Sequence, residues 1–178
     1  MYGQFGGTER VTFALIEEQL RRGAADLLYI EGGGEALSLP PNTRTIKLAG
    51  GRMLNCIRPL ATYLRQERPE ALVVSSWPLT VYAVVARYLS GAPTRLILCE
   101  HNTLSLQYAE LGVFHRLALR ASIAVAYPSA DARIAVSSGV ASDLAKLGRI
   151  STSSISVIDN PVRWIAGQES LADVAVSE

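Results

Sequence analysis

The stretch Leu96-Ile97-Leu98-Cys99-Glu100-His101-Asn102 passes directly from an apolar run into an acid, an imidazole and an amide. Four consecutive apolar residues predict a strand that is buried on both faces, as in a parallel sheet. In open α/β sheets, ligands bind beyond the carboxyl ends of the strands. We therefore expect Glu100, His101 and Asn102 to lie at the edge of the sheet where a ligand binds.

Strand-like and helix-like segments alternate on both sides of this stretch. Apolar runs between turn residues predict strands at 26–30, 45–48, 71–75, 95–99, 131–136 and 155–158. Apolar stripes of helical spacing predict helices at 9–22, 53–67, 78–89, 115–127 and 137–147. Pro59 inside the second helix indicates a kink or a later start. This order predicts an α/β fold, a Rossmann-like parallel sheet with helices on both faces.

One segment, 103–114, has two interpretations. Its leucines, Tyr108 and Phe114 make it too apolar for a fully exposed loop. It is either a helical lid or a surface for an apolar substrate at the crevice, or it packs into the core. The residues alone leave these alternatives open.

Composition excludes several classes of protein. With 178 residues, 49% of them hydrophobic, and 19% charged, the chain predicts one domain with a sizeable core. The net charge is +1 and the basic residues are scattered, so no nucleic-acid binding is expected. Cys56 and Cys99 are in apolar surroundings, which is typical of reduced core thiols in a cytosolic protein. Because no signal peptide and no long apolar run are evident, we expect a soluble cytoplasmic domain.

A glycine-rich opening, Tyr2-Gly3-Gln4-Phe5-Gly6-Gly7, leads straight into the first expected helix. Backbone N–H groups at such a junction bind anions, although a simple tight turn explains the glycines equally well. A loop of this kind normally follows a strand, and only a few residues precede it here. Either that strand lies outside this chain or the fold does without it. The first strand of a doubly wound sheet is central, so we expect the sheet of this chain to lack a central strand.

His101 is the strongest candidate for chemistry, because imidazole can donate or accept a proton near neutral pH. A histidine that merely ends a strand is the competing interpretation. Neighbouring residues on a strand point to opposite faces, so Glu100 is expected to support the loop rather than to pair with His101. His115 is the only other histidine and no Cys/His ligand spacing occurs, so no metal site is expected. The residues predict a ligand-binding crevice and name no reaction.

Four short motifs nevertheless occur in a recognisable order: Gly6-Gly7-Thr8-Glu9-Arg10, Glu100-His101-Asn102, Ala135-Val136-Ser137-Ser138-Gly139-Val140 and Val157-Ile158-Asp159-Asn160-Pro161-Val162. This series resembles the N-terminal, acceptor-side domain of family 4 glycosyltransferases, over nearly the whole chain to Val162. The resemblance implies the GT-B arrangement, in which two Rossmann-like domains face each other and a nucleotide-sugar lies between them. It implies retaining hexosyl transfer from that nucleotide-sugar to an acceptor, without a cofactor or metal.

The resemblance also implies roles for particular residues. His101 would contact the transferred sugar, with Glu100 and Asn102 as acceptor-side or supporting residues. The residues expected on the donor side are Gly6, Gly7, Ser137 and Gly139. The segment 104–114 would border the site of a sugar or lipid-linked acceptor, which suits a protein that is peripheral at a membrane.

The family's C-terminal domain, which holds most of the donor, has no counterpart in the sequence. We expect residues 1–162 to form the N-terminal domain and 163–178 to be a tail or the start of an interdomain linker. A C-terminal partner domain or chain would then complete the site, and this chain alone is expected to be inactive. The alternative is a noncatalytic Rossmann-like binding or interaction module. A nicotinamide enzyme is a distant third, since the G-x-G-x-x-G fingerprint is absent.

Overall fold

Strands and helices alternate along the chain in the computed structural model, which describes residues 7–30, 43–49 and 52–160. The strands are β1 (Asp26–Ile30), β2 (Arg44–Ala49), β3 (Ala71–Ser75), β4 (Arg95–Glu100), β5 (Ala132–Ala135) and β6 (Ser156–Val157). The α-helices are α1 (Gly7–Arg22), α2 (Ile57–Glu67), α3 (Leu79–Ser90), α4 (Leu104–Gln107), α5 (Val113–Ala126) and α6 (Ser138–Gly148). Short 3-10 turns are η1 (Met53–Cys56), η2 (Tyr127–Ser129) and η3 (Thr152–Ser154). The expected α/β fold is confirmed, and each strand lies within a residue of its predicted ends.

The strands form two parallel sheets, one with the order β1-β2 and one with the order β3-β4-β5-β6. In the doubly wound order, the first strand lies between the second and the fourth. That position corresponds here to the interval between β1 and β3, and no described strand occupies it. Among the described residues no strand joins β1 to β3, and the strands form two separate sheets.

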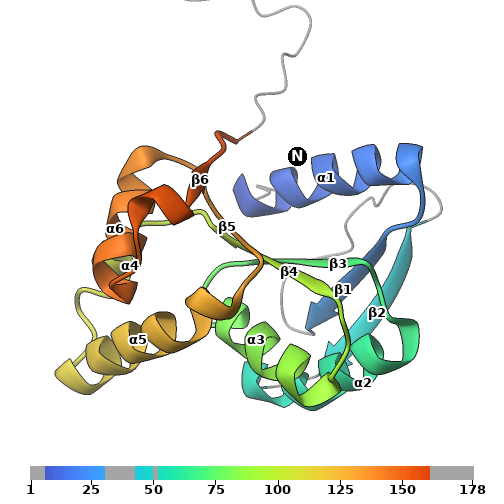
Figure 1. The fold of residues 1–178 in the computed structure, drawn as a ribbon, viewed down its shortest axis with the longest axis horizontal. Coiled ribbons are helices and arrows are strands. Elements are labelled where there is room, and N and C mark those ends of the chain that lie inside the picture. The colour runs from blue at the N-terminus through green and yellow to red at the C-terminus, as the bar shows by residue number, and fades with distance from the viewer. Residues whose placement is uncertain (1–6, 31–42, 50–51, 161–178) are drawn as a thin grey trace, which may run out of the picture.

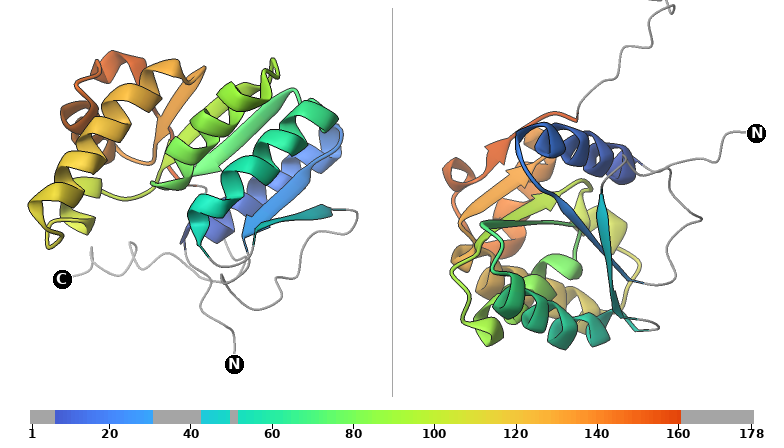
Figure 2. Two further views of the ribbon diagram at one scale, coloured as in Figure 1. Left: turned by 90° about the horizontal axis from the view of Figure 1, so that it is seen from below. Right: turned by 90° about the vertical axis from the view of Figure 1, so that its right-hand side faces the viewer.

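Helices cover both faces of the larger sheet. Figure 1 shows α1 on one face and α2, α3 and α5 on the other, and the side view in Figure 2 shows the same layers. Leu96 and Leu98 of β4 are fully buried and pack with Leu64 of α2 and Ile123 of α5 in one core cluster. The face towards α1 is less completely covered, because Val73 of β3 remains 47% exposed. The layer formed by α2, α3 and α5 therefore supplies most of the core.

The helix around Pro59 starts later than 53, as one of the two sequence interpretations allowed. Residues Met53–Cys56 form the 3-10 turn η1, and α2 begins at Ile57. Pro59 consequently lies in the first turn of α2, where its missing N–H has no intrahelical acceptor to bond. None of the described helices combines the length and apolar character needed to span a membrane.

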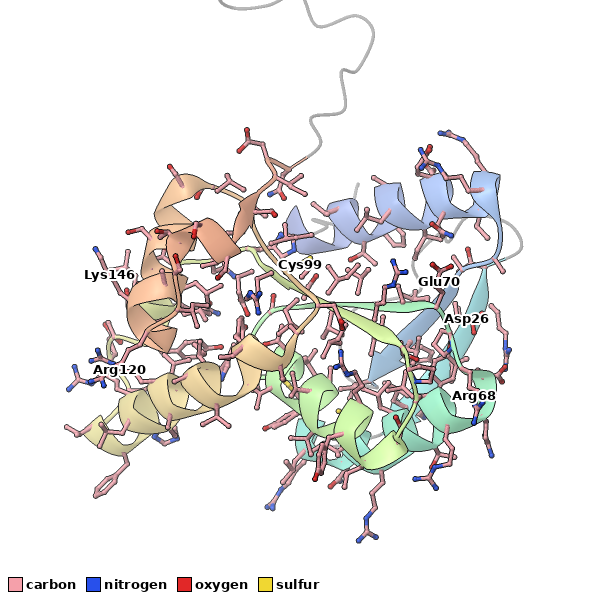
Figure 3. All side chains as sticks on the ribbon, viewed as in Figure 1. Asp26, Arg68, Glu70, Cys99, Arg120 and Lys146 are labelled. Carbon is pink, nitrogen blue, oxygen red and sulfur yellow. The ribbon has the colours of Figure 1, made fainter. Side chains whose placement is uncertain are left out.

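Both cysteines are free thiols within the core, as predicted. Cys56 is 2% exposed and Cys99 is 7% exposed. Burial, helped by the neighbouring Glu100, raises the pKa of the Cys99 thiol to about 11. Figure 3 labels Cys99 on β4, in the interior of the molecule. The protonated thiol acts here as a small apolar side chain.

The smaller sheet is fastened to α2 by a polar cluster at its edge. The Arg44 guanidinium on β2 lies 2.7 Å from the Glu67 carboxylate. The Tyr63 hydroxyl donates to the Asp26 carboxylate of β1 at 2.8 Å. Both contacts join the β1-β2 sheet to the helix that leads into β3, so they set where the smaller sheet sits.

Gly148 of α6 packs closely against α5. A Cβ placed on Gly148 would lie 2.8 Å from Cγ2 of Ile123, a buried β-branched side chain with little freedom to move. We expect Gly148→Ala to lower the free energy of unfolding by about 1–2 kcal/mol, because overpacking outweighs the gain in helix propensity. Urea unfolding followed by circular dichroism measures this change.

Gly139→Ala is the matched control for that stability measurement. Gly139 lies in the first turn of the same helix, and its Cβ would have only the Ser137 hydroxyl oxygen nearby, at 3.8 Å. This variant is expected to be neutral or slightly stabilising. Equal stabilisation by both alanines would contradict the close approach at Gly148.

Candidate functional site

The carboxyl ends of β3, β4, β5 and β6 meet at one edge of the larger sheet. The parallel register pairs Ser75 with Cys99, Glu100 with Ala135, and Ala135 with Val157. The backbone continues this alignment past the strand ends, since Val136 N–H donates to the Glu100 carbonyl at 3.2 Å. The residues that follow these strands, which were expected to line the crevice, therefore lie along the same edge of the sheet.

His101 lies at this edge in a partly buried position. Its Nε2 is 3.3 Å from the Ser75 hydroxyl oxygen on the neighbouring strand. Its Nδ1 is buried and has no hydrogen-bond partner among the described residues. Burial lowers the pKa of His101, and the nearby Asn160 side chain opposes this shift in part. The imidazole is therefore neutral at neutral pH, and each nitrogen can donate or accept according to its tautomer.

Glu100 points away from His101 into the core, as the alternation of side chains along a strand predicts. It is 1% exposed, and its Oε1 accepts hydrogen bonds from the hydroxyls of Tyr127 and Thr80. Those two hydroxyls are themselves 2.8 Å apart. Burial raises the pKa of Glu100 to about 7, against the hydrogen bonds from Tyr127, the Trp77 backbone and Thr80, which lower it. This network ties α3 and η2 to the end of β4.

The turn from β3 into α3 lies beside this network. Ser76 has a positive φ of 68°, and the Trp77-Pro78 peptide bond is cis. The Trp77 indole N–H donates to the Ser122 hydroxyl on α5 at 3.1 Å. Its ring meets that of Tyr108 edge to face, with 4.9 Å between centroids. Trp77 thus anchors both α5 and the segment that follows His101.

The two interpretations of the segment 103–114, core packing and an exposed apolar surface, each hold for one half of it. Leu104 is buried and Tyr108 packs on Trp77, so the first half contributes to the core. Leu106, Val113 and Phe114 are largely exposed. The second half therefore presents an apolar surface to the outside.

Two hollows in the described surface lie away from His101. One is lined by residues of β2 and α2, among them Arg44 and Tyr63. The other lies between α4 and α5 and includes Tyr108 and Leu117. His101 lines neither of them. Across residues 7–30, 43–49 and 52–160, no group of three or more His, Cys, Asp or Glu side chains is placed to hold a metal ion.

Comparison with known proteins identifies the fold that this edge belongs to. The model of Glycosyltransferase Family 4 matches residues 5–163. The chain belongs to this family. No curated protein matches the sequence. Among solved structures, the chain is similar to the apo form of the lipopolysaccharide outer core galactosyltransferase WaaB, with a TM-score of 0.66 and 19% identity.

That similarity covers 90% of this chain and 44% of WaaB. At 19% identity the similarity shows the fold alone. This fold is one part of the GT-B arrangement, a Rossmann-like domain. The family 4 chain therefore spans less than half the length of the galactosyltransferase that it resembles. The recognition of an N-terminal glycosyltransferase domain from four short motifs is confirmed.

The remaining predicted site residues of this family 4 domain have clear positions, and their roles stay predictions. Ser137 caps α6, because its hydroxyl accepts from the Val140 N–H at 3.2 Å. Gly139 and Asn102 are exposed, and Gly7 is the first residue of α1. Gly6 and the expected tail at 163–178 lie outside the described residues.

Three contributors to the site were not predicted from the sequence. Ser75 was recognised only as the end of a strand, although the shared edge of neighbouring parallel strands could have indicated its contact with His101. No sequence pattern indicated a role for Thr80 or Tyr127, because each occurs as an ordinary residue in a segment predicted to be helical. Their hydroxyls meet Glu100 only through the packing of α3 and η2 on β4.

Proposed function

We propose that this chain forms the acceptor-side half of a retaining glycosyltransferase, which transfers a hexosyl group from a nucleotide-sugar to an acceptor. The observation that carries the proposal is His101, a neutral imidazole at the carboxyl edge of the sheet, whose Nε2 lies 3.3 Å from the Ser75 hydroxyl oxygen. Open α/β sheets bind ligands at this edge. Membership of family 4 supplies the reaction class.

In this proposal His101 positions the transferred sugar. A neutral imidazole can donate an N–H to one sugar hydroxyl without adding a fixed positive charge to the site. During transfer, the bond between the anomeric carbon and the diphosphate oxygen breaks, and the acceptor oxygen bonds to the same face of that carbon. The departing diphosphate takes up the electron pair and the negative charge, and its freed oxygen accepts the proton that the acceptor hydroxyl loses.

Backbone N–H groups at helix starts would stabilise that charge. Gly6 and Gly7 lead into α1, and Ser137 and Gly139 stand at the start of α6. Helix N-termini carry a partial positive charge and favour phosphate groups. Asn102 and the exposed part of 104–114 would face the sugar or lipid-linked acceptor, while Glu100 supports β4 from the core.

A second domain would complete the donor site. The structural similarity covers 44% of the WaaB chain, so more than half of that galactosyltransferase has no counterpart in the matched region. We infer that residues 1–162 act together with a C-terminal donor-binding domain or partner chain, and that 163–178 lead towards it. A single wall of a cleft leaves the nucleotide exposed to water and poorly oriented, which removes most of the catalytic advantage of proximity.

A domain-complementation experiment tests the proposal. The purified 178-residue chain is incubated with radiolabelled UDP- and GDP-hexoses and a panel of soluble and lipid-linked acceptors. It is expected to transfer no sugar above background. A chimera that joins residues 1–162 to the C-terminal domain of a family 4 enzyme is expected to transfer sugar with retention, which NMR of the product's anomeric proton reports.

Either half of that result can fail. Transfer by the chain alone would contradict its expected dependence on a second domain. A chimera that folds, binds nucleotide-sugar through its C-terminal domain and transfers nothing to any acceptor would favour the noncatalytic binding module. Formation of the opposite anomer would reject the retaining mechanism.

A further inference from the structure

Ser75 and His101 come from neighbouring strands and share one face of the larger sheet. The parallel register places Ser75, the last residue of β3, beside Cys99 of β4. Because side chains alternate along a strand, His101, two residues beyond Cys99, points to the same side as Ser75. Ser75 is therefore the diagonal neighbour of His101 across the two strands, and its hydroxyl oxygen lies 3.3 Å from the imidazole Nε2.

The two nitrogens of this imidazole have different surroundings. Nε2 has the Ser75 hydroxyl within hydrogen-bonding distance, whereas Nδ1 is buried and has no partner in the part of the chain that the structure describes. Burial lowers the pKa of His101, so the ring is neutral at neutral pH and carries a single N–H. A proton on Nδ1 would be a buried donor without an acceptor. Among buried polar groups, unpaired N–H donors are rarer than acceptors that are not fully paired, so the proton belongs on Nε2.

We propose that His101 is held in its Nε2–H tautomer and that Ser75 is its positioning residue, with the Ser75 hydroxyl oxygen accepting the hydrogen bond from Nε2–H. The tautomer follows from the contacts of the ring, and its use in catalysis rests on the proposed function. There the same N–H reaches a sugar hydroxyl, and a contact of 3.3 Å is long enough for the proton to be shared with a sugar oxygen. Ser75 acts through His101 and makes no contact with the sugar itself.

A second polar side chain, that of Asn160, also lies beside the ring. Asn160 raises the pKa of His101, as a hydrogen-bond acceptor does. It is exposed and follows β6, which is two strands away from β4 in the sheet order. Ser75, in contrast, is fixed by the pairing of β3 with β4. The acceptor role therefore goes to Ser75, and Asn160→Ala is the variant that distinguishes the two residues.

NMR of the imidazole nitrogens in the full chain tests the tautomer. The sequence has two histidines, so a ¹⁵N-labelled sample gives two ring patterns, and His115→Ala assigns them. Long-range ¹⁵N–¹H spectra at about pH 8, above the ordinary pKa of histidine, show which nitrogen of the neutral ring carries the proton. We expect Nε2–H in His101 of the parent chain. In Ser75→Ala this proton should exchange with water roughly five-fold faster, and in Ser75→Thr, which keeps the hydroxyl, at the parent rate.

Kinetics in the chimera that carries a donor domain test whether Ser75 acts through His101. Ser75→Ala is expected to lower kcat/KM by roughly five- to ten-fold, and Ser75→Thr should recover most of that loss. Added to His101→Ala, the same replacement should change the rate by less than about two-fold, because its partner is already gone. Ser156→Ala is the matched control. Ser156 is an exposed strand serine of the same sheet, on β6, and its replacement should leave the His101 spectrum and the rate unchanged.

The NMR and the kinetics fail separately. A proton on Nδ1 in the parent chain, or an exchange rate that Asn160→Ala raises and Ser75→Ala does not, would overturn the role of Ser75. A further large loss from Ser75→Ala in the His101→Ala background would overturn its action through His101, because Ser75 would then touch the substrate or support the fold by itself. If the parent chimera transfers no sugar, the proposed function fails, and the NMR of the chain still decides the tautomer and its acceptor.

Discussion

Replacing His101 with alanine is expected to lower the rate of sugar transfer by at least about 100-fold in the chimera that carries a donor domain. His101 is the one imidazole at the carboxyl edge of the described sheet, and the contact of its Nε2 with the Ser75 hydroxyl orients the ring. Alanine removes both the hydrogen bond to the sugar and the side chain that excludes water beside it. Initial rates with a water-soluble acceptor, at several donor concentrations, separate the loss in kcat from the change in KM.

His115→Ala is the control for this loss, since His115 is the other histidine and lies exposed on α5. It should leave the rate with a soluble acceptor unchanged. His101→Gln should recover part of the activity, because an amide N–H can replace one imidazole donor. Unchanged turnover in His101→Ala would remove His101 from the site and leave only its position at the strand end.

The sequence predicts the elements of this fold well, because each strand is a local apolar run. The clearest example is the apolar run Leu96–Cys99, which ends at the polar Glu100. The structure has a strand, β4, at these residues. The opposite directions of the two side chains at the end of this strand could also be predicted. The two-residue period of a strand sends Glu100 inward and His101 to the edge.

Features that depend on tertiary packing could not be predicted in this way. The segment 103–114 has apolar residues along its whole length, and its sequence does not tell which of them are covered. Tyr108 packs on Trp77, which lies far earlier in the chain, whereas Phe114 is exposed. The separation of β1-β2 from β3-β6 likewise depends on which strands meet in space. The partners of Glu100 come from α3 and η2, and no local pattern joins them.

The second large effect concerns this buried carboxyl group. Glu100→Ala is expected to lower the free energy of unfolding by about 3 kcal/mol, because it leaves a cavity and removes the acceptor that the hydroxyls of Tyr127 and Thr80 share, so that at least one of them loses its partner. Glu100→Gln keeps one acceptor oxygen and nearly the same volume, so its loss should be smaller. Urea unfolding at pH 6, monitored by tryptophan fluorescence, measures both variants against the parent chain.

Glu100 should also make stability depend on pH in an unusual direction. Its pKa is raised from 4.5 to about 7 in the folded chain, mainly by burial. Between these values the folded state holds a proton that the unfolded state has released, so the contribution is complete below pH 4.5 and is lost as the pH rises to about 7. The total loss is of the order of 3 kcal/mol. The difference in unfolding free energy between the parent chain and Glu100→Gln isolates it from other titrating groups.

Tyr127→Phe provides the decisive comparison for that assignment. The Tyr127 hydroxyl donates to the carboxylate and lowers its pKa, in opposition to burial. Without this donor the ionised form of Glu100 is less stable, so the pH at which the loss of stability levels off should move upwards. Glu100→Gln combined with Tyr127→Phe should show none of this dependence. If the parent chain and Glu100→Gln lose stability in parallel from pH 4.5 to 7, another group titrates there, and Glu100 is ionised in the core throughout.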